Sequence, residues 1–358
     1  MGTGRHAARR VGKVTIDRAR GPRPGHSARI AVLPGRSRAL IDVIIPAYRG
    51  FAETRRAIES VLASRVALPH EVTVIDDACP EPALCAWLRE QAQAGRFTLV
   101  VHEKNLGFVR GANEGLSLHP DRDVVLLNSD TEVADGWLDR LAACAARGER
   151  IGTVTPFSNN ATICSFPDMA GNHAMPPGFD VGAVDGAFAE ANAGTAVDIP
   201  TAVGFCMYVT RACLDAIGRF DAEAFGTGYG EEVDFCLRAT RAGFRHRLCA
   251  DAFVFHQGEV SFGDAGAGRR GEAQRIVDGR YPEFQGLVRD FLARDPAAPH
   301  RARAAARLRA LTAARGAALP ADLAVAQAAP PRRSPRGRDS RAAFATPSPP
   351  TPAETWCS

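Results

Sequence analysis

The sequence predicts an α/β fold in which helices cover both faces of a mostly parallel sheet. Short apolar runs alternate with stretches of helical periodicity, and the apolar runs end in loop-forming or polar residues. Strands that alternate with helices are joined by crossovers, which make the strands parallel and bury them on both faces. The predicted strands are 42–48, 71–77, 97–102 and 123–130, and the intervening helices are 51–64, a segment through Trp87 to Gln93, and 111–118.

The individual elements have local signals. The first run is apolar until Pro46 interrupts it, which predicts a strand that ends at a loop. In the segment that follows, Ala57, Ile58, Val61 and Leu62 recur at helical spacing. Later signals predict further strands at 151–155, 204–208 and 252–255, a polar loop at 156–160 and a glycine-rich loop at 226–230.

Composition excludes several classes of protein. The 358 residues are 46% hydrophobic and 23% charged, which is ordinary for a globular chain and excludes a wholly disordered one. The longest apolar-leaning stretches, such as 199–210, are shorter than the roughly 18 to 20 residues of a membrane span. No apolar segment follows the basic residues at the N-terminus, so we expect no secretory signal and a cytoplasmic protein.

The nine cysteines show no C-x-x-C spacing, and several lie inside apolar segments. Free cysteine behaves as a small buried hydrophobe in a reducing compartment, so we expect these thiols to be structural. Zinc binding is the second interpretation of the cysteines.

The charge distribution is uneven although the net charge is only +4. Residues 1–40 carry ten basic residues against one acidic residue, and 301–358 carry ten arginines against three acidic residues, so the centre is acidic. Such basic ends are either solvated extensions or a means of peripheral association with an anionic membrane surface. We expect no nucleic-acid partner, because no motif that reads nucleic acid accompanies the charge.

The same patterns divide the chain into four parts. Residues 1–40 are a basic tail that we expect to be disordered, and 41–290 form the α/β domain. Residues 291–329 are a basic helical extension, with a helix at 301–315. Residues 330–358 form a Pro/Arg/Ala-rich tail with too few large apolar residues to fold.

Ligands of open α/β sheets bind beyond the carboxyl ends of the strands, so the polar residues there are candidate site residues. The first turn reads Pro46-Ala-Tyr-Arg-Gly50 and lacks the glycine pattern of a dinucleotide site, and no P-loop occurs. The phosphates of a nucleotide bound here would therefore need another source of positive charge, such as a divalent cation held by carboxylates. Asp130, at the end of a predicted strand, is well placed to hold one.

Five ordered motifs resemble those of family-two glycosyltransferases. They are Ile41-Asp-Val-Ile-Ile-Pro-Ala-Tyr-Arg, Val74-Ile-Asp-Asp-Ala, Asn105-Leu-Gly-Phe-Val-Arg-Gly-Ala-Asn113, Leu126-Leu-Asn-Ser-Asp-Thr131 and Gly228-Tyr-Gly-Glu-Glu-Val-Asp-Phe-Cys-Leu-Arg238. The resemblance covers about residues 41–260 and is closest to bacterial enzymes that build rhamnose-containing or other surface polysaccharides. It implies a GT-A fold and an inverting, nucleotide-sugar-dependent activity.

The resemblance also implies a donor site. Pro46, Ala47 and Tyr48 would line a nucleoside pocket, and Asp77 would accept a hydrogen bond from a pyrimidine N–H, with Asp76 as the structural carboxylate. Capping of the following helix is the alternative role for this aspartate pair. Asn105 and Arg110 flank Gly107, and Arg110 would face the diphosphate.

By the same resemblance, Asp130 and His256 would bind Mn²⁺ or Mg²⁺ against the diphosphate of the donor. Asn128 stands where many relatives have aspartate, which leaves a neutral oxygen and predicts weaker metal binding. A structural role is the alternative for His256.

Glu232 would be the base that deprotonates the acceptor hydroxyl, with Glu231 and Asp234 as supporting groups. The family usually has aspartate at the position of Glu232, and acidic residues that merely decorate a helix N-terminus are the alternative.

These inferences predict a metal-dependent inverting glycosyltransferase. It would move sugar from a UDP- or dTDP-sugar to a glycan or lipid-linked acceptor in cell-surface polysaccharide or cell-wall synthesis. A nucleotide-sugar-binding pseudo-enzyme without turnover is the alternative, since Asn128 and Glu232 depart from the usual pattern. A nucleotidyltransferase is less favoured, because a basic glycine-rich loop is missing after the first strand.

Overall fold

The computed structural model describes residues 40–169, 171–226, 228–258 and 266–315. The predictions for the basic tail before residue 40 and for the Pro/Arg/Ala-rich tail after residue 329 therefore lie outside the described residues. Within the described part, no helix is both long and apolar enough to cross a bilayer.

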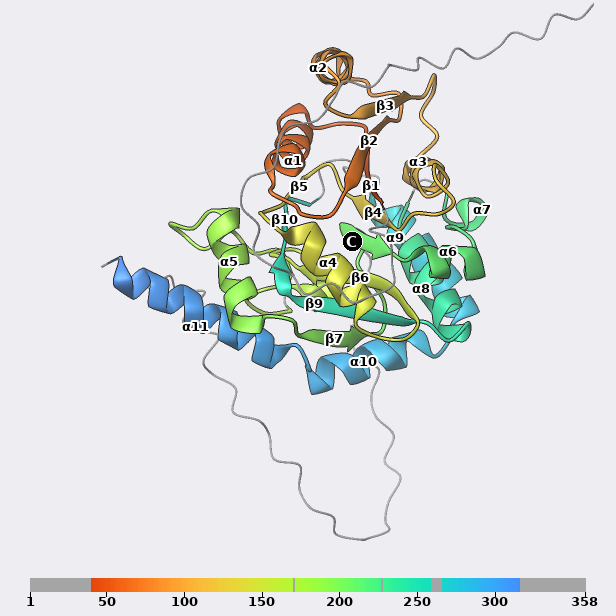
Figure 1. Ribbon diagram of the computed structural model, residues 1–358. Helices are drawn as coiled ribbons and strands as arrows, with labels where there is room; N and C mark the ends of the chain where they lie inside the picture. Colours follow the sequence, from red (N-terminus) through yellow and green to blue (C-terminus); the bar gives the residue numbers. More distant parts are fainter. Residues whose placement is uncertain (1–39, 170, 227, 259–265, 316–358) are drawn as a thin grey trace, which may run out of the picture.

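An eight-stranded mixed sheet forms the centre of the molecule, in the order β3-β2-β1-β4-β8-β6-β9-β7 (Figure 1). Six strands run in one direction, whereas β8 and β7 pair antiparallel to their neighbours. The predicted strands correspond to the first four within a few residues. The strands are β1 (Ile41–Ala47), β2 (His70–Asp76), β3 (Thr98–Val101), β4 (Val124–Leu127), β6 (Ile151–Phe157), β7 (Ala196–Ile199), β8 (Cys206–Val209) and β9 (Arg245–Phe253).

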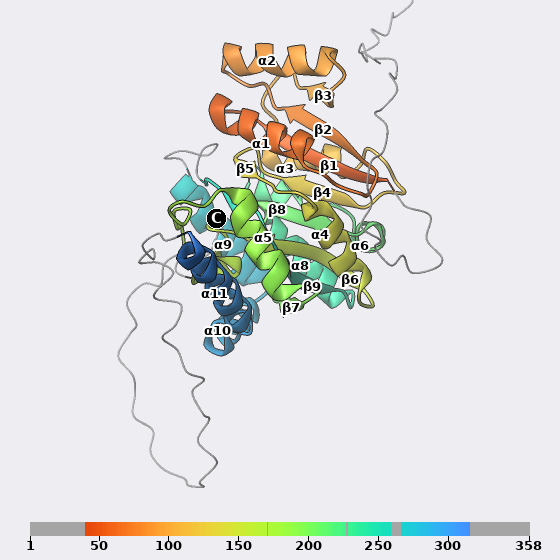
Figure 2. The ribbon, with the colours of Figure 1, turned by 60° about the vertical axis from the view of Figure 1, so that its left-hand side comes forward.

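Helices cover both faces of this sheet (Figure 2), as the alternating pattern predicted. Successive side chains of β1 alternate between two apolar clusters, with Val43 and Ile45 in one and Ile44 in the other. One cluster includes α1 (Phe51–Ala63), α2 (Pro82–Gln93), α4 (Trp137–Ala146), α5 (Val181–Asn192) and α11 (Ala298–Ala314). The other includes α3 (Phe108–Gly115), α6 (Arg211–Ile217), α7 (Ala222–Phe225), α8 (Glu231–Arg241), α9 (Gly266–Arg280) and α10 (Phe284–Arg294).

A second, two-stranded sheet lies beside the main one. It joins β5 (Thr131–Glu132) to β10 (Phe255–His256) in antiparallel register, with His256 opposite Thr131. This pairing links segments more than 120 residues apart and brings His256 next to Asp130. A short 3-10 helix, η1 (Thr162–Cys164), follows β6.

The C-terminal helices belong to the packed molecule. The basic helix predicted at 301–315 corresponds to α11, which packs against α5 and buries Ala304, Ala305 and Leu308. The predicted domain boundary at residue 290 falls inside α10, whose Val288 and Phe291 are both buried. All eight cysteines among the described residues are free thiols, and six of them are buried.

Candidate functional site

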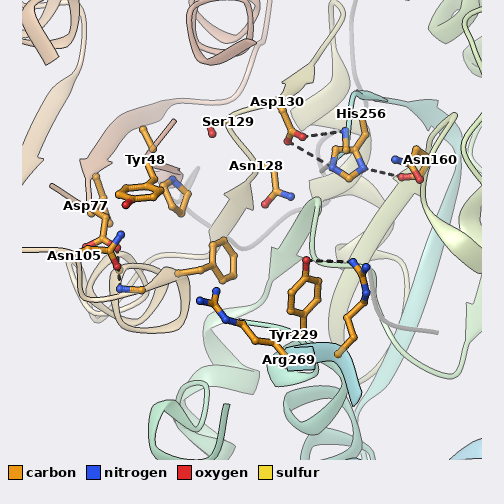
Figure 3. A pocket seen from close by; sticks show the side chains of 18 of the residues that line it. Tyr48, Asp77, Asn105, Asn128, Ser129, Asp130, Asn160, Tyr229, His256 and Arg269 are labelled. Atoms are coloured by element: carbon orange, nitrogen blue, oxygen red, sulfur yellow. Dashed lines mark hydrogen bonds and ion pairs between the residues drawn. The ribbon is translucent and has the colours of Figure 1, made fainter. Parts of the chain in front are cut away.

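A cavity of about 540 Å³ opens at the carboxyl ends of β1, β2 and β4 (Figure 3). This is the edge where the strands of an open α/β sheet present a ligand site. Residues from the strand ends, the start of α3, the loop after β6 and the start of α9 line the cavity. They are Pro46, Ala47, Tyr48, Ile75, Asp77, Asn105, Gly107, Phe108, Gly111, Asn128, Ser129, Asp130, Asn160, Asn172, Tyr229, His256, Gly258, Arg269 and Arg270.

One end of the cavity is aromatic and apolar. Tyr48, which is labelled in Figure 3, follows β1. Phe108 begins α3 and Ile75 belongs to β2, and both line the cavity. Gly107 has φ = 85° and ψ = 156°, a backbone conformation that L side chains rarely adopt, and α3 begins at the next residue. A flat heterocycle fits a pocket with such walls.

Asp77 lies at this apolar end, and its carboxylate is already partly engaged. Its Oδ1 accepts from the backbone N–H of Leu106 at 2.7 Å and its Oδ2 from that of Gly107 at 2.8 Å. The Nδ1 of His102 is 2.7 Å from Oδ1. Oδ2 thus retains room for one more donor. Asp76 instead accepts from the backbone N–H of Cys79 at 2.7 Å, which is a structural contact.

Asp130 and His256 lie next to each other in the lining of the cavity, on the far side from Tyr48 and Asp77 (Figure 3). The His256 Nε2 is 3.5 Å from Asp130 Oδ1, and Asp130 Oδ2 accepts from the backbone N–H of Gly258 at 3.0 Å. The other ring nitrogen, Nδ1, is 2.7 Å from the carbonyl oxygen of Asn160. A carbonyl only accepts, so Nδ1 carries a proton, and Nε2 is the ring nitrogen directed at the carboxylate.

This donor set fits a divalent cation. Metal-ligating histidines usually donate their other N–H to a backbone carbonyl or carboxylate, which fixes the ring as Asn160 does here. The ring also stacks on Phe205, with 5.2 Å between ring centroids. A carboxylate oxygen and an imidazole nitrogen that lie side by side are both ligand types that divalent cations accept. Two protein ligands leave further coordination positions for substrate oxygens.

Two other groups of metal-ligand type occur among the described residues, and neither lines the cavity. In the first, the Arg122 guanidinium lies 2.9 Å from Asp42 and 2.7 Å from Glu71, and already neutralises the carboxylates beside His119. In the second, the Asp76, Cys79 and Cys85 side chains hydrogen-bond to the backbone of the loop after β2. The Asp130 and His256 pair is therefore the better candidate.

The predicted diphosphate-binding arginine is not among the cavity residues. Arg110 is exposed on α3 and does not line the cavity, although its neighbours Phe108 and Gly111 do. Arg269 and Arg270 of α9 line it instead (Figure 3), and the Arg270 guanidinium carbon lies 5.3 Å from the centroid of the Tyr229 ring. Neither arginine was predicted from the sequence. The available signal was an Arg-Arg pair after the glycine-rich stretch 263–268.

The predicted base lies apart from the other site residues. Glu232 begins α8 with Glu231 and lines a separate cavity of about 30 Å³, walled by η1, the segment 201–203 and α10. A Cβ placed on Gly204 would be 3.8 Å from the Glu232 side chain, so this backbone runs beside Glu232. In the preceding glycine-rich loop, Gly228, Tyr229 and Gly230 all have positive φ.

Burial controls the protonation of both glutamates at the start of α8. It raises the pKa of Glu232 to about 7, although backbone N–H groups at the helix start oppose the shift. Burial, and then repulsion by Glu232, raise the pKa of Glu231 well above its ordinary value. Within the described part of the chain, the Oε2 atom of Glu231 is buried without a hydrogen-bond partner. A carboxyl that titrates near neutral pH has the pKa that a general base needs.

Comparisons with known proteins identify the family of the chain. The sequence model described as "Glycosyltransferase like family 2" matches residues 38–270. Three uncharacterised mycobacterial proteins, Rv1525 and MT1576 of Mycobacterium tuberculosis and Mb1552 of Mycobacterium bovis, are 26% identical over 102 residues. That match covers 26% of this chain and 39% of the relatives, so the chain spans about two fifths of their length.

Two solved structures are similar. The structure titled GalNAc-T7 with UDP, GalNAc and Mn²⁺ has a TM-score of 0.52 at 16% identity, over 73% of this chain and 51% of the other. S. aureus TarS has a TM-score of 0.43 at 17% identity, over 66% of this chain and 40% of the other. With a family match over well more than half of its residues, the chain belongs to glycosyltransferase family 2 and has the GT-A fold.

Proposed function

We propose that the protein is a metal-dependent inverting glycosyltransferase that uses a UDP- or dTDP-sugar. The observation that carries this proposal is the Asp130 and His256 pair in the lining of the large cavity, where Nε2 of His256 lies 3.5 Å from the carboxylate and Nδ1 donates to the Asn160 carbonyl. Family membership and the GT-A fold support it. A divalent cation held there would neutralise the charge on the departing diphosphate.

The two ends of the cavity suit the two ends of such a donor. Asp77, with one acceptor position left on Oδ2, favours a base that offers an N–H, as uracil and thymine do. Tyr48 and Phe108 supply apolar walls for that base. Arg269 and Arg270 bring positive charge into the cavity, which suits a diphosphate.

Glu232 is the proposed base for the transfer. The acceptor hydroxyl gives its proton to the Glu232 carboxylate while its oxygen forms a bond to the anomeric carbon. The bond from that carbon to the diphosphate oxygen breaks, and the nucleoside diphosphate leaves with the bonding pair. Attack from the face opposite the leaving group inverts the configuration. By analogy with the relatives implied by the sequence motifs, the acceptor would be a growing glycan or a lipid-linked saccharide of the cell surface.

One observation favours a second candidate, a nucleotide-sugar-binding protein without turnover. Glu232 lines a cavity of about 30 Å³ rather than the donor cavity, and Asn128 replaces a charged ligand with a neutral amide. A protein of this second kind would bind donor and metal with the same residues but transfer nothing.

The two candidates are separated by a turnover assay on the full chain. We would incubate it with UDP-, dTDP- and GDP-sugars and Mn²⁺, with and without a mixed saccharide acceptor pool, and measure nucleoside diphosphate release and glycan product. Acceptor-stimulated release from a UDP- or dTDP-sugar supports the enzyme. Metal-dependent donor binding without any release supports the second candidate, and absence of both contradicts the two proposals.

A further inference from the structure

We propose that His102 and Glu114 are positioning residues for the donor base and act through Asp77. This inference rests on the proposed function, because it assumes that a nucleotide base contacts Asp77. Neither His102 nor Glu114 lines the cavity. Their proposed role is to hold the Asp77 carboxylate, which does line it, in position for the nucleotide base.

The geometry is a carboxylate, an imidazole and a second carboxylate in a row. His102 follows β3, and its backbone N–H donates to the carbonyl of Asp76 at 2.9 Å. Its Nδ1 is 2.7 Å from Asp77 Oδ1, and its Nε2 is 2.8 Å from Glu114 Oε2 on α3. The imidazole is only 8% exposed. The three side chains thus tie the end of β2 to α3 through the residue that follows β3.

Asp77 also fixes the cavity wall on its other side. It accepts the backbone N–H groups of Leu106 and Gly107, and Gly107 lines the cavity beside Asn105. A shift of the Asp77 carboxylate therefore moves both the acceptor for the base and the loop before α3. His102 controls that shift because it holds Asp77 Oδ1 directly.

The protonation state of His102 determines whether its ring donates to one or to both of the carboxylates of Asp77 and Glu114. Only the imidazolium can donate from both nitrogens, and the charged groups that face the ring are Asp77, directly after β2, and Glu114 of α3. Burial acts to lower the pKa of His102, but the hydrogen bonds to these two carboxylates outweigh it and raise the pKa above its ordinary value. The form that donates from both nitrogens therefore persists to higher pH than in a free imidazole and is lost as the pH rises through the raised pKa.

The test compares His102→Gln with wild type, using the full chain, Mn²⁺ and UDP between pH 5.5 and 8.5. Glutamine donates from one end only, as neutral histidine does. The phosphate of UDP titrates in the same range and affects both proteins equally, so the measured quantity at each pH is the UDP dissociation constant of His102→Gln divided by that of wild type. We expect this ratio to be about tenfold at pH 6 and to fall toward one at pH 8.5. In turnover, KM for the donor rises while kcat stays nearly unchanged.

Glu114→Gln is the second variant, since Glu114 is 43% exposed and its loss leaves the core intact. It moves the titration of His102 to lower pH, measured by NMR on the ring protons and assigned by the signal that His102→Gln removes. The matched control is His119→Gln, in which another histidine loses a buried carboxylate partner, Asp42, away from the cavity. It leaves the ratio near one at every pH.

A ratio for His102→Gln that is near one at pH 6, or the same at every pH, overturns the inference and leaves the proposed function intact. The inference also fails if Glu114→Gln leaves the His102 titration unchanged. If wild type binds no UDP at any pH, the proposed function fails first and the inference falls with it.

Discussion

The large cavity at the strand ends and the cavity around Glu232 differ in size and in the elements that line them. The first holds about 540 Å³ and is lined by strand ends and by polar groups with unused hydrogen-bonding capacity. The second holds about 30 Å³, room for one or two waters, and is lined in part by Phe284 and Val288 of α10. We infer that the large cavity is preformed at the edge of the sheet, whereas the proposed base, Glu232, can reach a saccharide acceptor only if the walls of its small cavity rearrange.

The largest expected effect is a loss of sugar transfer without a loss of UDP binding when Glu232 is replaced. Glu232→Gln lowers transfer about a thousandfold, because the base is lost, and leaves UDP binding within about twofold of wild type. In wild type, the rate rises with pH through about 7, where Glu232 becomes ionised. Initial rates and calorimetric UDP affinities check this, with Glu223→Gln on the exposed surface of α7 as the control. Near wild-type transfer by Glu232→Gln would show that another group is the base.

The buried glutamate also makes stability depend on pH. The folded chain holds the Glu232 proton up to about pH 7, while an unfolded glutamate releases it near 4.5. The contribution of Glu232 to the free energy of unfolding is therefore fully present below pH 4.5 and is lost as the pH rises through about 7, a decrease on the order of 3 kcal/mol. Urea unfolding at both ends of this range should show a smaller decline for Glu232→Gln than for wild type. Equal declines would mean that Glu232 is not buried as described.

On the donor side, Asp130→Asn should lower metal-dependent UDP affinity and transfer by about a hundredfold, since the amide keeps the shape but removes the charge that binds the cation. Calorimetry with and without Mn²⁺ measures it. The matched control is Asp135→Asn, which removes an exposed carboxylate that pairs with Arg65 and does not line the cavity. Unchanged affinity in Asp130→Asn would remove Asp130 from the metal site.

The smallest expected effect is a difference in UDP affinity between variants of Arg269 and variants of arginines outside the cavity. Arg269→Ala should weaken UDP binding about tenfold, because a charge-assisted contact to the diphosphate is lost. Arg275→Ala, on the same helix but outside the cavity, should change it less than about twofold, as should Arg110→Ala. Salt titrations of UDP affinity check that the loss is electrostatic. A larger loss for Arg110→Ala than for Arg269→Ala would restore the role predicted from the sequence.

The same contrast explains what the sequence could and could not predict. The strands before Tyr48, Asp77 and Asn128 were predictable because apolar runs and the polar residues after them are local signals. The contact of Asp130 with His256 depends on the antiparallel pairing of β5 with β10, which no periodicity encodes. The roles of His102, Arg269 and Arg270 likewise depend on which helices pack beside the strand ends. Glu232 was identified by its motif, but its burial beneath α10 follows only from tertiary packing.

Calorimetric titration of UDP into the full chain, with and without Mn²⁺, is the most direct test of the proposed metal centre. We predict that Mn²⁺ tightens UDP binding by at least about tenfold in wild type and has no such effect in His256→Gln, which cannot present the same nitrogen lone pair to the cation. UDP affinity that is independent of Mn²⁺ in wild type would contradict the claim that Asp130 and His256 form the metal centre of a donor site.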